Sequence, residues 1–537
     1  MTDPTPTRAE HAAHGAHAHA HGEHGHAAPL SQAPVTRRTW LAFAVVLLGT
    51  AIALLDTTIV NVALPVIRTS IHADEATLSW IVSGYALAYG LALIPAGRIG
   101  DRFGHKWVFV VGIALFTIAS LAAGLSQSSG ELIAARVVQG LAGGIFFPPV
   151  TALIQLMFPG RVRGRAFAIF GAVIGVATAI GPIVGGLLIQ WLGDEQGWRS
   201  IFFVNLPLGV VAFVAALILL PSGAEGANAR GIDLVGFVLL AGALTAILIP
   251  LIQGQDEGWP LWTYLSLAGG VVLLVLFALW EIGVARRGRT TPLVPPHLFS
   301  HPAFTGGVIL ALVYFAAFTS IFFTISLFWQ SGLQHTALES GLVSIPFAVG
   351  SIFGSALSNR LAVTLGRTVL IIGTALVSIG LIATWLLVWR VSPLDITDLD
   401  LLPGLLVAGF GSGLFIAPNA QFIVATVDRP EAGAASGVIG TAQRIGAAIG
   451  IAVIGSILFG SLPDSFAPTK AQIAEAGQRF GAQGPDAVKA ALKTVVDHNL
   501  AHGFGTGAAW ALFTSAIFAV VAFALVFTLP RRVSRGY

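Results

Sequence analysis

Apolar stretches long enough to cross a membrane dominate the chain, and short polar segments separate them. A membrane-spanning helix needs about 20 mainly apolar residues to cross ~30 Å of hydrocarbon. This length predicts fourteen helical spans, at residues 39–63, 79–97, 107–125, 132–157, 165–191, 200–220, 234–253, 262–284, 304–328, 338–358, 368–389, 401–423, 433–460 and 507–529. Between the last two spans, residues 461–506 form a long polar loop with a helical spacing of apolar positions. We expect this loop to lie against the outer mouth of the protein.

Composition supports a polytopic membrane protein built only from helices. Of 537 residues, 55% are hydrophobic and only 10% are charged, and the mean hydropathy is +0.84. A soluble protein needs far more polar surface to cover its core. Cysteine is absent, which excludes disulfides, thiolate nucleophiles and cysteine-based metal sites.

The basic residues indicate how the chain is oriented. Most of the 28 lysines and arginines fall in alternate loops, those on the same side as the N-terminus. The positive-inside rule therefore predicts an even number of spans in the cell membrane, with both termini cytoplasmic. Because these residues do not form one stripe, the net charge of +3 gives no reason to expect a nucleic-acid partner. No cleavable signal peptide is evident, so the first span is expected to stay in the protein.

The N-terminal tail, residues 1–36, is a low-complexity segment rich in histidine. His17, His19 and His21 are candidate metal ligands, because closely spaced imidazoles chelate zinc, nickel or copper. A disordered, dispensable tail is the alternative.

Asp56 is a carboxylate inside the first predicted span. A charged side chain at the bilayer centre costs roughly 2.5–3.5 kcal/mol on insertion scales, so such groups usually face a polar pathway and carry protons, ions or substrate. Transport is therefore the first functional hypothesis. A purely structural hydrogen bond to Thr57 or Asn61 is the alternative.

Residues 97–106, between the second and third spans, form a tight turn that reads Gly-Arg-Ile-Gly-Asp-Arg-Phe-Gly-His-Lys. This turn resembles the signature loop of the major facilitator superfamily. The resemblance implies a conformational latch, in which an acid accepts hydrogen bonds from a neighbouring helix, at Gly97, Asp101, Arg102, Gly104 and Lys106. Residues 358–367 echo the turn in the second half of the chain, with Asn359 at the acid position. This echo favours an internal duplication, and the resemblance implies two six-helix bundles around a central cavity.

Two further spans carry motifs that are similar to those of this superfamily. Arg136 in the fourth span matches a motif with a buried arginine, which implies a role in proton coupling together with Asp56, whereas a snorkelling arginine is the alternative. The fifth span matches a glycine and proline motif that is typical of proton-coupled exporters, at Gly171, Gly175, Gly181, Pro182, Gly185 and Gly186. A generic packing helix is the alternative for this span.

Residues 56–65, 198–207 and 433–446, together with the number of spans, resemble the fourteen-span drug:proton antiporter branch of the superfamily. The resemblance implies a six-helix bundle at 37–220, a two-helix linker insertion at 221–303, a second six-helix bundle at 304–530 containing the outside loop 461–506, and a cytoplasmic tail at 531–537. Asp56 is then the expected protonation site. Candidate residues of the substrate cavity are Asn61, Gln139, Tyr314, Phe318, Phe322, Asn419, Gln443 and Arg444.

The sequence predicts a monomeric, proton-coupled exporter of small hydrophobic or cationic compounds, such as amphipathic drugs or antibiotics. Glu281 and Glu339 lie near span ends, so the sequence offers no second carboxylate in the middle of the membrane. We therefore do not expect a preference for dications. No phosphate-binding loop or hydrolase motif is evident, so we expect no enzymatic activity and no cofactor. A lipid or siderophore exporter of the same fold, or a metal-responsive membrane sensor that uses the histidine tail, remain as alternatives.

Overall fold

Helices make up every regular element of the described chain. The computed structural model describes residues 35–530 except 74, 223–232, 255–256, 289, 426, 428–430, 464 and 481–482, and within helices it leaves out the side chains of 65, 75–76, 79, 160–161, 179, 194–195 and 337. The helices are α1 (Arg37–Ser70), α2 (Glu75–Phe103), α3 (His105–Leu125), α4 (Ser129–Met157), α5 (Gly160–Phe203), α6 (Asn205–Leu219), α7 (Leu234–Gln253), α8 (Leu261–Arg287), η2 (Pro296–Ser300), α9 (Pro302–Leu327), η3 (Phe328–Gly332), α10 (Ala337–Leu342), α11 (Ile345–Leu365), α12 (Thr368–Arg390), η4 (Pro393–Asp395), α13 (Asp398–Val424), α14 (Ala432–Gly460), α15 (Lys470–Phe480) and α16 (Pro485–Val526).

Fourteen helices in the described chain are long and apolar enough to cross a membrane, which confirms the predicted number. Membranes favour this architecture because a helix satisfies all of its backbone hydrogen bonds internally. The fifth and sixth spans are nearly continuous, with a break in helical geometry at Gly193, where φ is 75°. Because only a few residues separate these two spans, the sequence predicted the number of spans correctly but predicted the ends of these two less accurately.

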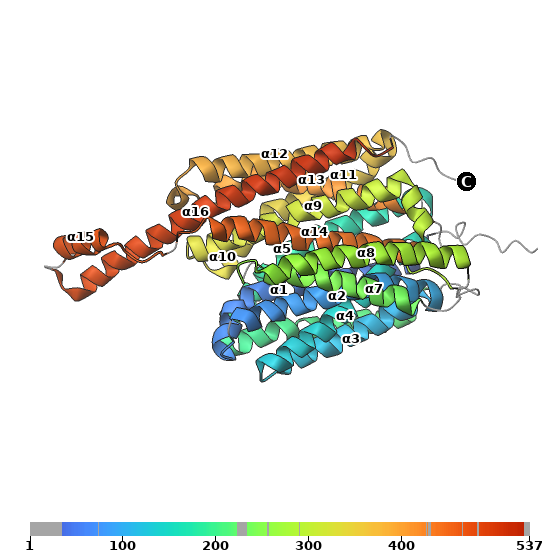
Figure 1. The fold of residues 1–537 in the computed structure, drawn as a ribbon, viewed down its shortest axis with the longest axis horizontal. Coiled ribbons are helices and arrows are strands. Elements are labelled where there is room, and N and C mark those ends of the chain that lie inside the picture. Colours follow the sequence, from blue (N-terminus) through green and yellow to red (C-terminus); the bar gives the residue numbers. More distant parts are fainter. Residues whose placement is uncertain are drawn as a thin grey trace, which may run out of the picture. The chain divides into compact units, whose positions relative to one another are not determined.

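Two sets of six spans pack as separate neighbourhoods (Figure 1). In the first set α1 packs against α5 and α6, α2 against α4, and α3 against α4 and α6. In the second set α9 packs against α14 and α16, α11 against α13, and α12 against α13 and α16. The sets meet where α2 contacts α14 and where α5 contacts α10, α11 and α13. The interface between them is therefore made mainly by α2, α5, α11 and α14.

The additional pair, α7 and α8, forms an antiparallel hairpin beside this interface. Its two helices pack against each other, and α7 also contacts both α2 and α14. The hairpin thus touches one helix from each set of six.

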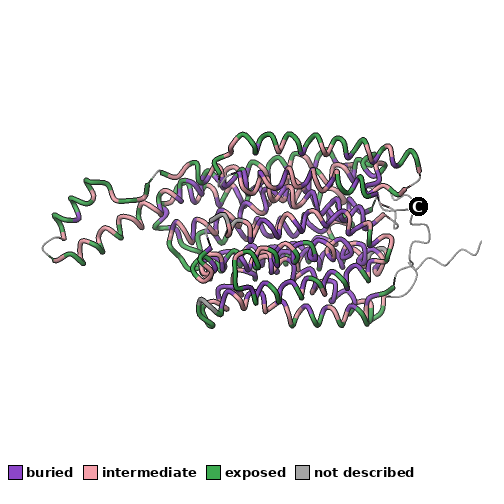
Figure 2. The backbone as a smooth tube through the Cα atoms, turned by 60° about the horizontal axis from the view of Figure 1, so that its bottom comes forward, coloured by how far each residue is buried: buried purple, intermediate pink, exposed green. Residues whose placement is uncertain are grey.

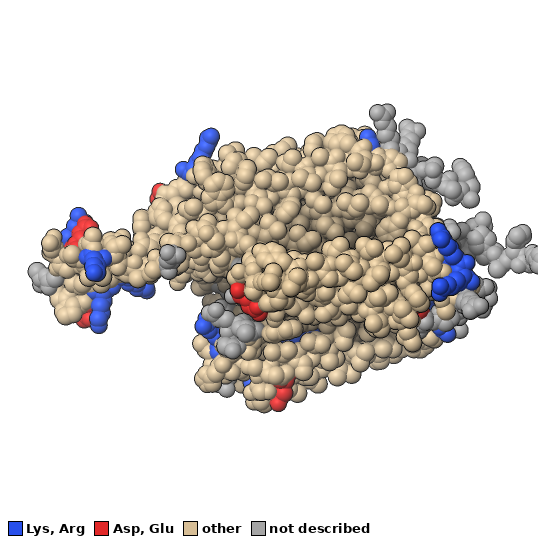
Figure 3. Space-filling model, viewed as in Figure 1, with Lys and Arg blue, Asp and Glu red and all other residues tan. Residues whose placement is uncertain are grey.

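Burial and charge are distributed as expected for a chain surrounded by lipid. The inner faces of the spans are buried and many outer faces are exposed (Figure 2). Large apolar side chains such as Ile118, Val238 and Leu279 are more than 60% exposed, which is the lipid-facing pattern rather than an aqueous surface. Lysine, arginine, aspartate and glutamate are concentrated at the two ends of the bundle and on α15 and the start of α16, and the face between them is almost free of charge (Figure 3).

Residues 461–506 are helical to a greater extent than the sequence predicted. The segment contains α15 and the beginning of α16, which continues without interruption into the last span. Figure 1 shows α15 and the beginning of α16 projecting from the bundle, and the main contact of α15 is with α16. The expectation that this segment lies against the mouth of the protein is therefore wrong for α15 and the beginning of α16, whereas Phe504 and Gly505 do pack against η3 and η4. The polar surface of α15 is consistent with its position away from the apolar spans.

Candidate functional site

Asp56 lies on α1, fully buried, and accepts hydrogen bonds from three side chains on two other helices. Its Oδ2 accepts a 2.7 Å bond from Nη1 of Arg136 on α4. Its Oδ1 accepts bonds from Nε2 of Gln139, at 2.9 Å, and from Nδ2 of Asn205 on α6, at 2.8 Å. Removing a carboxylate from water is costly unless it is paired and hydrogen-bonded, and this arrangement supplies both conditions.

The guanidinium of Arg136 is also held on several sides. It donates to the carbonyl of Ile81 on α2, at 3.2 Å, and to Oε1 of Gln139, at 2.7 Å. The ring of Tyr85 lies 4.1 Å from its central carbon, within the range of a cation–π contact. Because the side chain of Arg136 is only 1% exposed, it does not snorkel to an interface. The charge of Arg136 is therefore committed to Asp56.

Ser120 on α3 completes this cluster from the other side. Its hydroxyl oxygen accepts from Nε2 of Gln139 and from Nδ2 of Asn205, each at 3.1 Å, and the hydroxyl donates to the carbonyl of Phe202 at 2.9 Å. Six helices, α1 to α6, thus contribute side chains or backbone carbonyls to one polar cluster inside an apolar bundle. Asp56 bonds directly to Arg136, Gln139 and Asn205, so a substitution of its carboxylate changes the hydrogen bonding of these three side chains.

The turn at residues 97–106 joins α2 to α3 and bonds to the second set of helices. Gly104 has a φ of 93°, a backbone conformation that favours glycine, and it allows α3 to begin directly after α2 ends. Asp101 accepts backbone N–H bonds from Gly433, at 2.9 Å, and Ala434, at 3.1 Å. A carboxylate at this place satisfies free donors at the N-terminus of α14 and complements its dipole.

The helices on either side of this contact approach so closely that no side chain fits between them. A Cβ atom on Gly97 would lie 2.1 Å from the carbonyl oxygen of Gly433. Lys106 donates to the carbonyl of Leu217 at 2.8 Å, and the guanidinium of Arg102 lies 5.1 Å from the ring of Phe103. Of the five residues that the sequence assigned to a latch, Gly97 and Asp101 therefore meet α14, whereas Lys106 bonds to α6 and Arg102 lies beside Phe103.

We expect Asp101→Ala to loosen the contact between α2 and α14. The substitution removes two charge-assisted hydrogen bonds, each worth roughly 1.5–3 kcal/mol, and tenfold in an equilibrium constant corresponds to about 1.4 kcal/mol. Because the chain contains no cysteine, Ser436→Cys provides a single reporter, one turn from this contact and only 6% exposed. Two bonds at the lower end of this range amount to about 3 kcal/mol, so labelling by a maleimide should be on the order of 100-fold faster with Asp101→Ala.

The control is Asp486→Asn, which changes an exposed carboxylate in the first turn of α16. Equal labelling rates in the parent and in Asp101→Ala would show that Asp101 does not hold the two helices together.

The glycines of α5 contact both sets of helices. Cβ atoms on Gly181 and Gly185 would meet Thr58 and Ile59 of α1 at 1.9 and 2.9 Å. On the other face, Cβ atoms on Gly175 and Gly186 would meet Ser351 of α11 and Leu338 of α10 at 2.5 and 3.1 Å, and Gly171 faces Ala417 of α13. Pro182 lies within the same helix. This span is therefore the main packing partner of Asp56's helix and also a part of the interface between the sets.

The second-half echo of the 97–106 turn occupies the matching position against the first half. A Cβ atom on Gly164, near the start of α5, would lie 1.8 Å from Oδ1 of Asn359 at the end of α11. Gln421 on α13 also donates to the carbonyl of Gly164, at 3.4 Å. Each half thus places a polar side chain from the end of one helix against the beginning of a helix in the other half.

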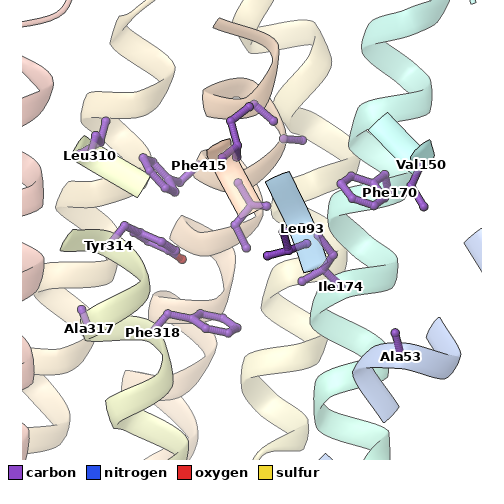
Figure 4. Packing of buried hydrophobic residues seen from close by; sticks show 14 of the residues in the cluster. Ala53, Leu93, Val150, Phe170, Ile174, Leu310, Tyr314, Ala317, Phe318 and Phe415 are labelled. Carbon is purple, nitrogen blue, oxygen red and sulfur yellow. The ribbon is translucent and has the colours of Figure 1, made fainter. Parts of the chain in front are cut away.

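Aromatic side chains of α9, α11 and α13 form a cluster that faces the first set of helices (Figure 4). The ring of Tyr314 stacks on Phe415 at 4.0 Å, and its hydroxyl donates to Ser412 at 2.7 Å. Phe318 and Phe322 lie 5.3 Å apart, and both contact Phe347. In Figure 4 the labelled residues Tyr314, Phe318 and Phe415 lie opposite Leu93, Phe170 and Ile174 of the first half.

The other candidate cavity residues lie in different surroundings. Gln139 belongs to the Asp56 cluster, Asn61 is exposed and Gln443 is half-buried. Asn419 donates to the carbonyl of Gly307 at 3.2 Å and so joins α13 to α9. The guanidinium of Arg444 on α14 lies 4.1 Å from the ring of Tyr89 on α2, across the interface between the halves. The structure therefore does not bring all eight candidates together in one place.

Sequence reasoning missed Ser120, Asn205 and Tyr85 as partners of the Asp56 cluster. Asn205 lies within residues 198–207, one of the stretches that resemble the antiporter branch, so the sequence did contain a pattern that could have identified it. No such pattern marked Ser120 or Tyr85. The candidate metal ligands His17, His19 and His21 lie outside the described residues. Within the part of the chain that is described, three or more histidine, aspartate or glutamate side chains do not come together as a metal site.

Comparison with known proteins gives a consistent result. The sequence model described as the Major Facilitator Superfamily matches residues 46–451. The chain is 34% identical over 453 residues to a protein named probable actinorhodin transporter from Streptomyces coelicolor, a match covering 83% of this chain and 78% of that protein. It is 33% identical over 463 residues to the tetracenomycin C resistance and export protein of Streptomyces glaucescens, covering 84% of this chain and 82% of that protein.

Among solved structures, the fold is similar to that of the proton:xylose symporter XylE. The match has a TM-score of 0.60 and 13% sequence identity, and it covers 92% of this chain and 96% of that one. At this identity the likeness shows a shared fold only.

Proposed function

Because the chain belongs to the Major Facilitator Superfamily, we propose that it is a proton-coupled exporter of amphipathic antibiotics or drugs. It is a multi-pass membrane protein, and the two curated relatives above are named for antibiotic transport or export. The single observation that carries the proton-coupling part of the proposal is the buried Asp56 with its Arg136 partner. This carboxylate, buried in the membrane and held by donors from α4 and α6, is the group that takes up and releases the proton in the proposed mechanism.

The proposed coupling uses the change in charge of the Asp56 cluster. When Asp56 is ionised it pairs with Arg136, and α1 is tied to α4 and α6 by the hydrogen bonds described above. When Asp56 is protonated the ion pair is lost, so the preferred packing of α1 against these helices changes. Because α1 also packs on the glycine face of α5, the change reaches the interface between the halves. Alternating access then results from two packings of that interface.

The orientation is part of the same proposal. The 97–106 turn carries Arg98, Arg102 and Lys106, so the positive-inside rule places it in the cytoplasm together with both termini. In that orientation the bonds from Asp101 to α14 close the cytoplasmic end of the interface. The protein acts as a single chain and as a carrier rather than an enzyme.

The aromatic cluster around Tyr314, Phe318 and Phe322 supports a flat, lipophilic substrate. Aromatic side chains bind such guests through large contact areas, and the hydroxyls of Tyr314 and Ser412 give the cluster a polar edge. The relatives' names give the first compounds to test, actinorhodin and tetracenomycin C.

The direct test is compound-driven proton movement in sealed proteoliposomes. Purified protein is reconstituted with a pH-sensitive dye inside, a pH gradient is imposed, and tetracenomycin C or actinorhodin is added. We expect proton flux that depends on the compound and on the protein, because antiport links the two movements. Protein-free liposomes provide the background.

Two results would contradict the proposal. If neither these compounds nor a lipophilic dye such as ethidium produces proton flux, the protein is not an antiporter of this class. If labelled phospholipid or a siderophore produces flux and the antibiotics do not, the substrate class is wrong although the coupling is right.

A further inference from the structure

A pair of buried acids lies at one end of the α7–α8 hairpin, far along the chain from Asp56. Asp233 immediately precedes α7 and Glu281 lies in α8, and the two residues are only 5% and 2% exposed. The sequence placed Glu281 near a span end, where a carboxylate would normally reach water. The structure instead buries it against α7, although both of these groups ordinarily carry a negative charge.

The two carboxyl groups have different hydrogen bonds. Asp233 accepts from the backbone N–H of Gly236, at 2.9 Å, and from the indole N–H of Trp280, at 2.8 and 3.0 Å to its two oxygens. Glu281 accepts one bond through Oε2, from the backbone N–H of Val294 at 3.2 Å. Its Oε1 is buried and has no hydrogen-bond partner among the described residues.

The space beside Gly236 shows how close the two groups are. A Cβ atom on Gly236 would lie 2.6 Å from Oδ2 of Asp233 and also 2.6 Å from Oε1 of Glu281. The unpartnered oxygen of Glu281 therefore faces the carboxylate of Asp233 across the gap that the glycine leaves. Two carboxylates this close in a buried place repel each other strongly when both are ionised.

The surrounding charges do not offset two negative groups. Arg98 on α2 is the cation that acts on Glu281, but its guanidinium is shared with Asp101, at 3.6 Å, and with the carbonyl of Leu293, at 2.9 Å. The other charged or titratable groups nearby are Glu431 before α14, which pairs with His297 of η2 at 3.0 Å, and His105 of α3, which lies 3.4 Å from Asp101. Among the described residues named here, the acids therefore outnumber the one arginine, Arg98.

We propose that Asp233 and Glu281 together bind one proton, at a site separate from Asp56. The proton resides on Oε1 of Glu281, which donates to Oδ2 of Asp233. Asp233 keeps the negative charge because it accepts two N–H bonds and caps the N-terminus of α7, where the helix dipole favours an anion. This arrangement gives the unpartnered oxygen a hydrogen bond and leaves only one charge buried in the pair.

The site is connected to the junction of α2 and α14. Glu281 holds the N–H of Val294, the neighbouring Leu293 carbonyl holds Arg98, and Arg98 pairs with Asp101, which caps α14. Loss of the shared proton adds a negative charge that competes with Asp101 for Arg98. The pair thus makes the contact between the halves sensitive to the proton concentration at this end of the protein.

Infrared spectroscopy of the purified, substrate-free full-length protein tests the site directly. A protonated carboxyl group gives a C=O band that is distinct from carboxylate bands. We expect the wild type near neutral pH to show one band that is absent from Glu281→Gln. In Asp233→Asn this band should move to higher wavenumber, because the acid no longer donates to a charged acceptor. Glu257→Gln, an exposed acid at the other end of the same hairpin that bonds to Trp262, should leave the band unchanged.

Three results would overturn the proposal. Identical wild-type and Glu281→Gln spectra would show that Glu281 carries no proton. An unmoved band in Asp233→Asn would show that the two residues do not share it. A band that appears only after Na⁺ and K⁺ are replaced by N-methylglucamine would show that the pair holds a metal cation instead. None of these outcomes depends on transport, so they remain distinct from failure of the antiport assay.

The link to the interface has its own measurement, the labelling of Ser436→Cys as a function of pH. Because maleimides react with the thiolate, whose fraction rises with pH, each labelling rate is divided by that of Ser465→Cys, an exposed reporter. We expect this ratio to rise with pH in the otherwise wild-type protein, and the added Glu281→Gln change to remove the rise. An unchanged pH dependence would contradict the connection through Arg98.

Discussion

Asp56→Asn is expected to abolish proton-driven accumulation of the exported compound while its exchange between the two sides of the membrane continues. One proton crossing about 100 mV supplies ~2.3 kcal/mol. For one neutral compound per proton, this sustains a gradient of about 50-fold. An asparagine keeps the size of Asp56, and its carbonyl oxygen can accept the bonds from Gln139 and Asn205. It cannot pair with Arg136 and cannot take up or release a proton, so the gradient should fall to none. The measurement is the steady-state distribution of labelled tetracenomycin C across energised proteoliposomes.

Counterflow of the labelled compound against unlabelled compound is the matched readout, because it needs folding, binding and the change of access but no net proton movement. Asp486→Asn, which alters an exposed acid of α16, is the control variant. A full gradient in Asp56→Asn would show that another group carries the transported proton.

Arg136→Met should cause the largest loss of stability. The substitution leaves Asp56 fully buried without its cation, and breaking a buried ion pair in this way costs about 3–5 kcal/mol. The free energy of unfolding can be followed by denaturant titration in mixed micelles. Arg444→Met should cost less, because the guanidinium of Arg444 contacts the ring of Tyr89 and pairs with no carboxylate within the described chain.

A double variant shows whether the loss comes from the unpaired charge. Asp56→Asn combined with Arg136→Met removes both charges, so we expect it to recover most of the stability that Arg136→Met alone loses. If the losses of the two single variants simply add, Asp56 and Arg136 do not form an energetically coupled pair, and the proposed coupling mechanism loses its basis.

The sequence predicted the helical class, the fourteen spans and the family well, because each depends on local patterns of apolar residues, charges and glycines. It could not predict which polar side chains meet inside the bundle. Arg136 and Asn205 are 80 and 149 positions away from Asp56 along the chain. A polar residue within an apolar span is easy to recognise in the sequence. The sequence does not show which neighbouring helix that residue faces. The same limit hid the contact between Asp233 and Glu281.

Residues 461–506 show a different limit. Their periodicity indicated helix, but local pattern alone could not show that α16 would continue from this polar segment into the last span. Nor could it show that α15 would pack on α16 instead of on the bundle. Both features depend on contacts between segments, which a periodicity measured along one segment does not contain.

The unbroken course of α16 has a practical consequence for imaging. Its 42 residues correspond to a rod of about 63 Å, roughly twice the thickness of the hydrocarbon layer. The projecting part, which packs on α15, extends beyond the apolar spans of a protein of only 55.7 kDa. A nanobody raised against this helical pair would serve as an alignment marker for electron cryomicroscopy without any engineered insertion.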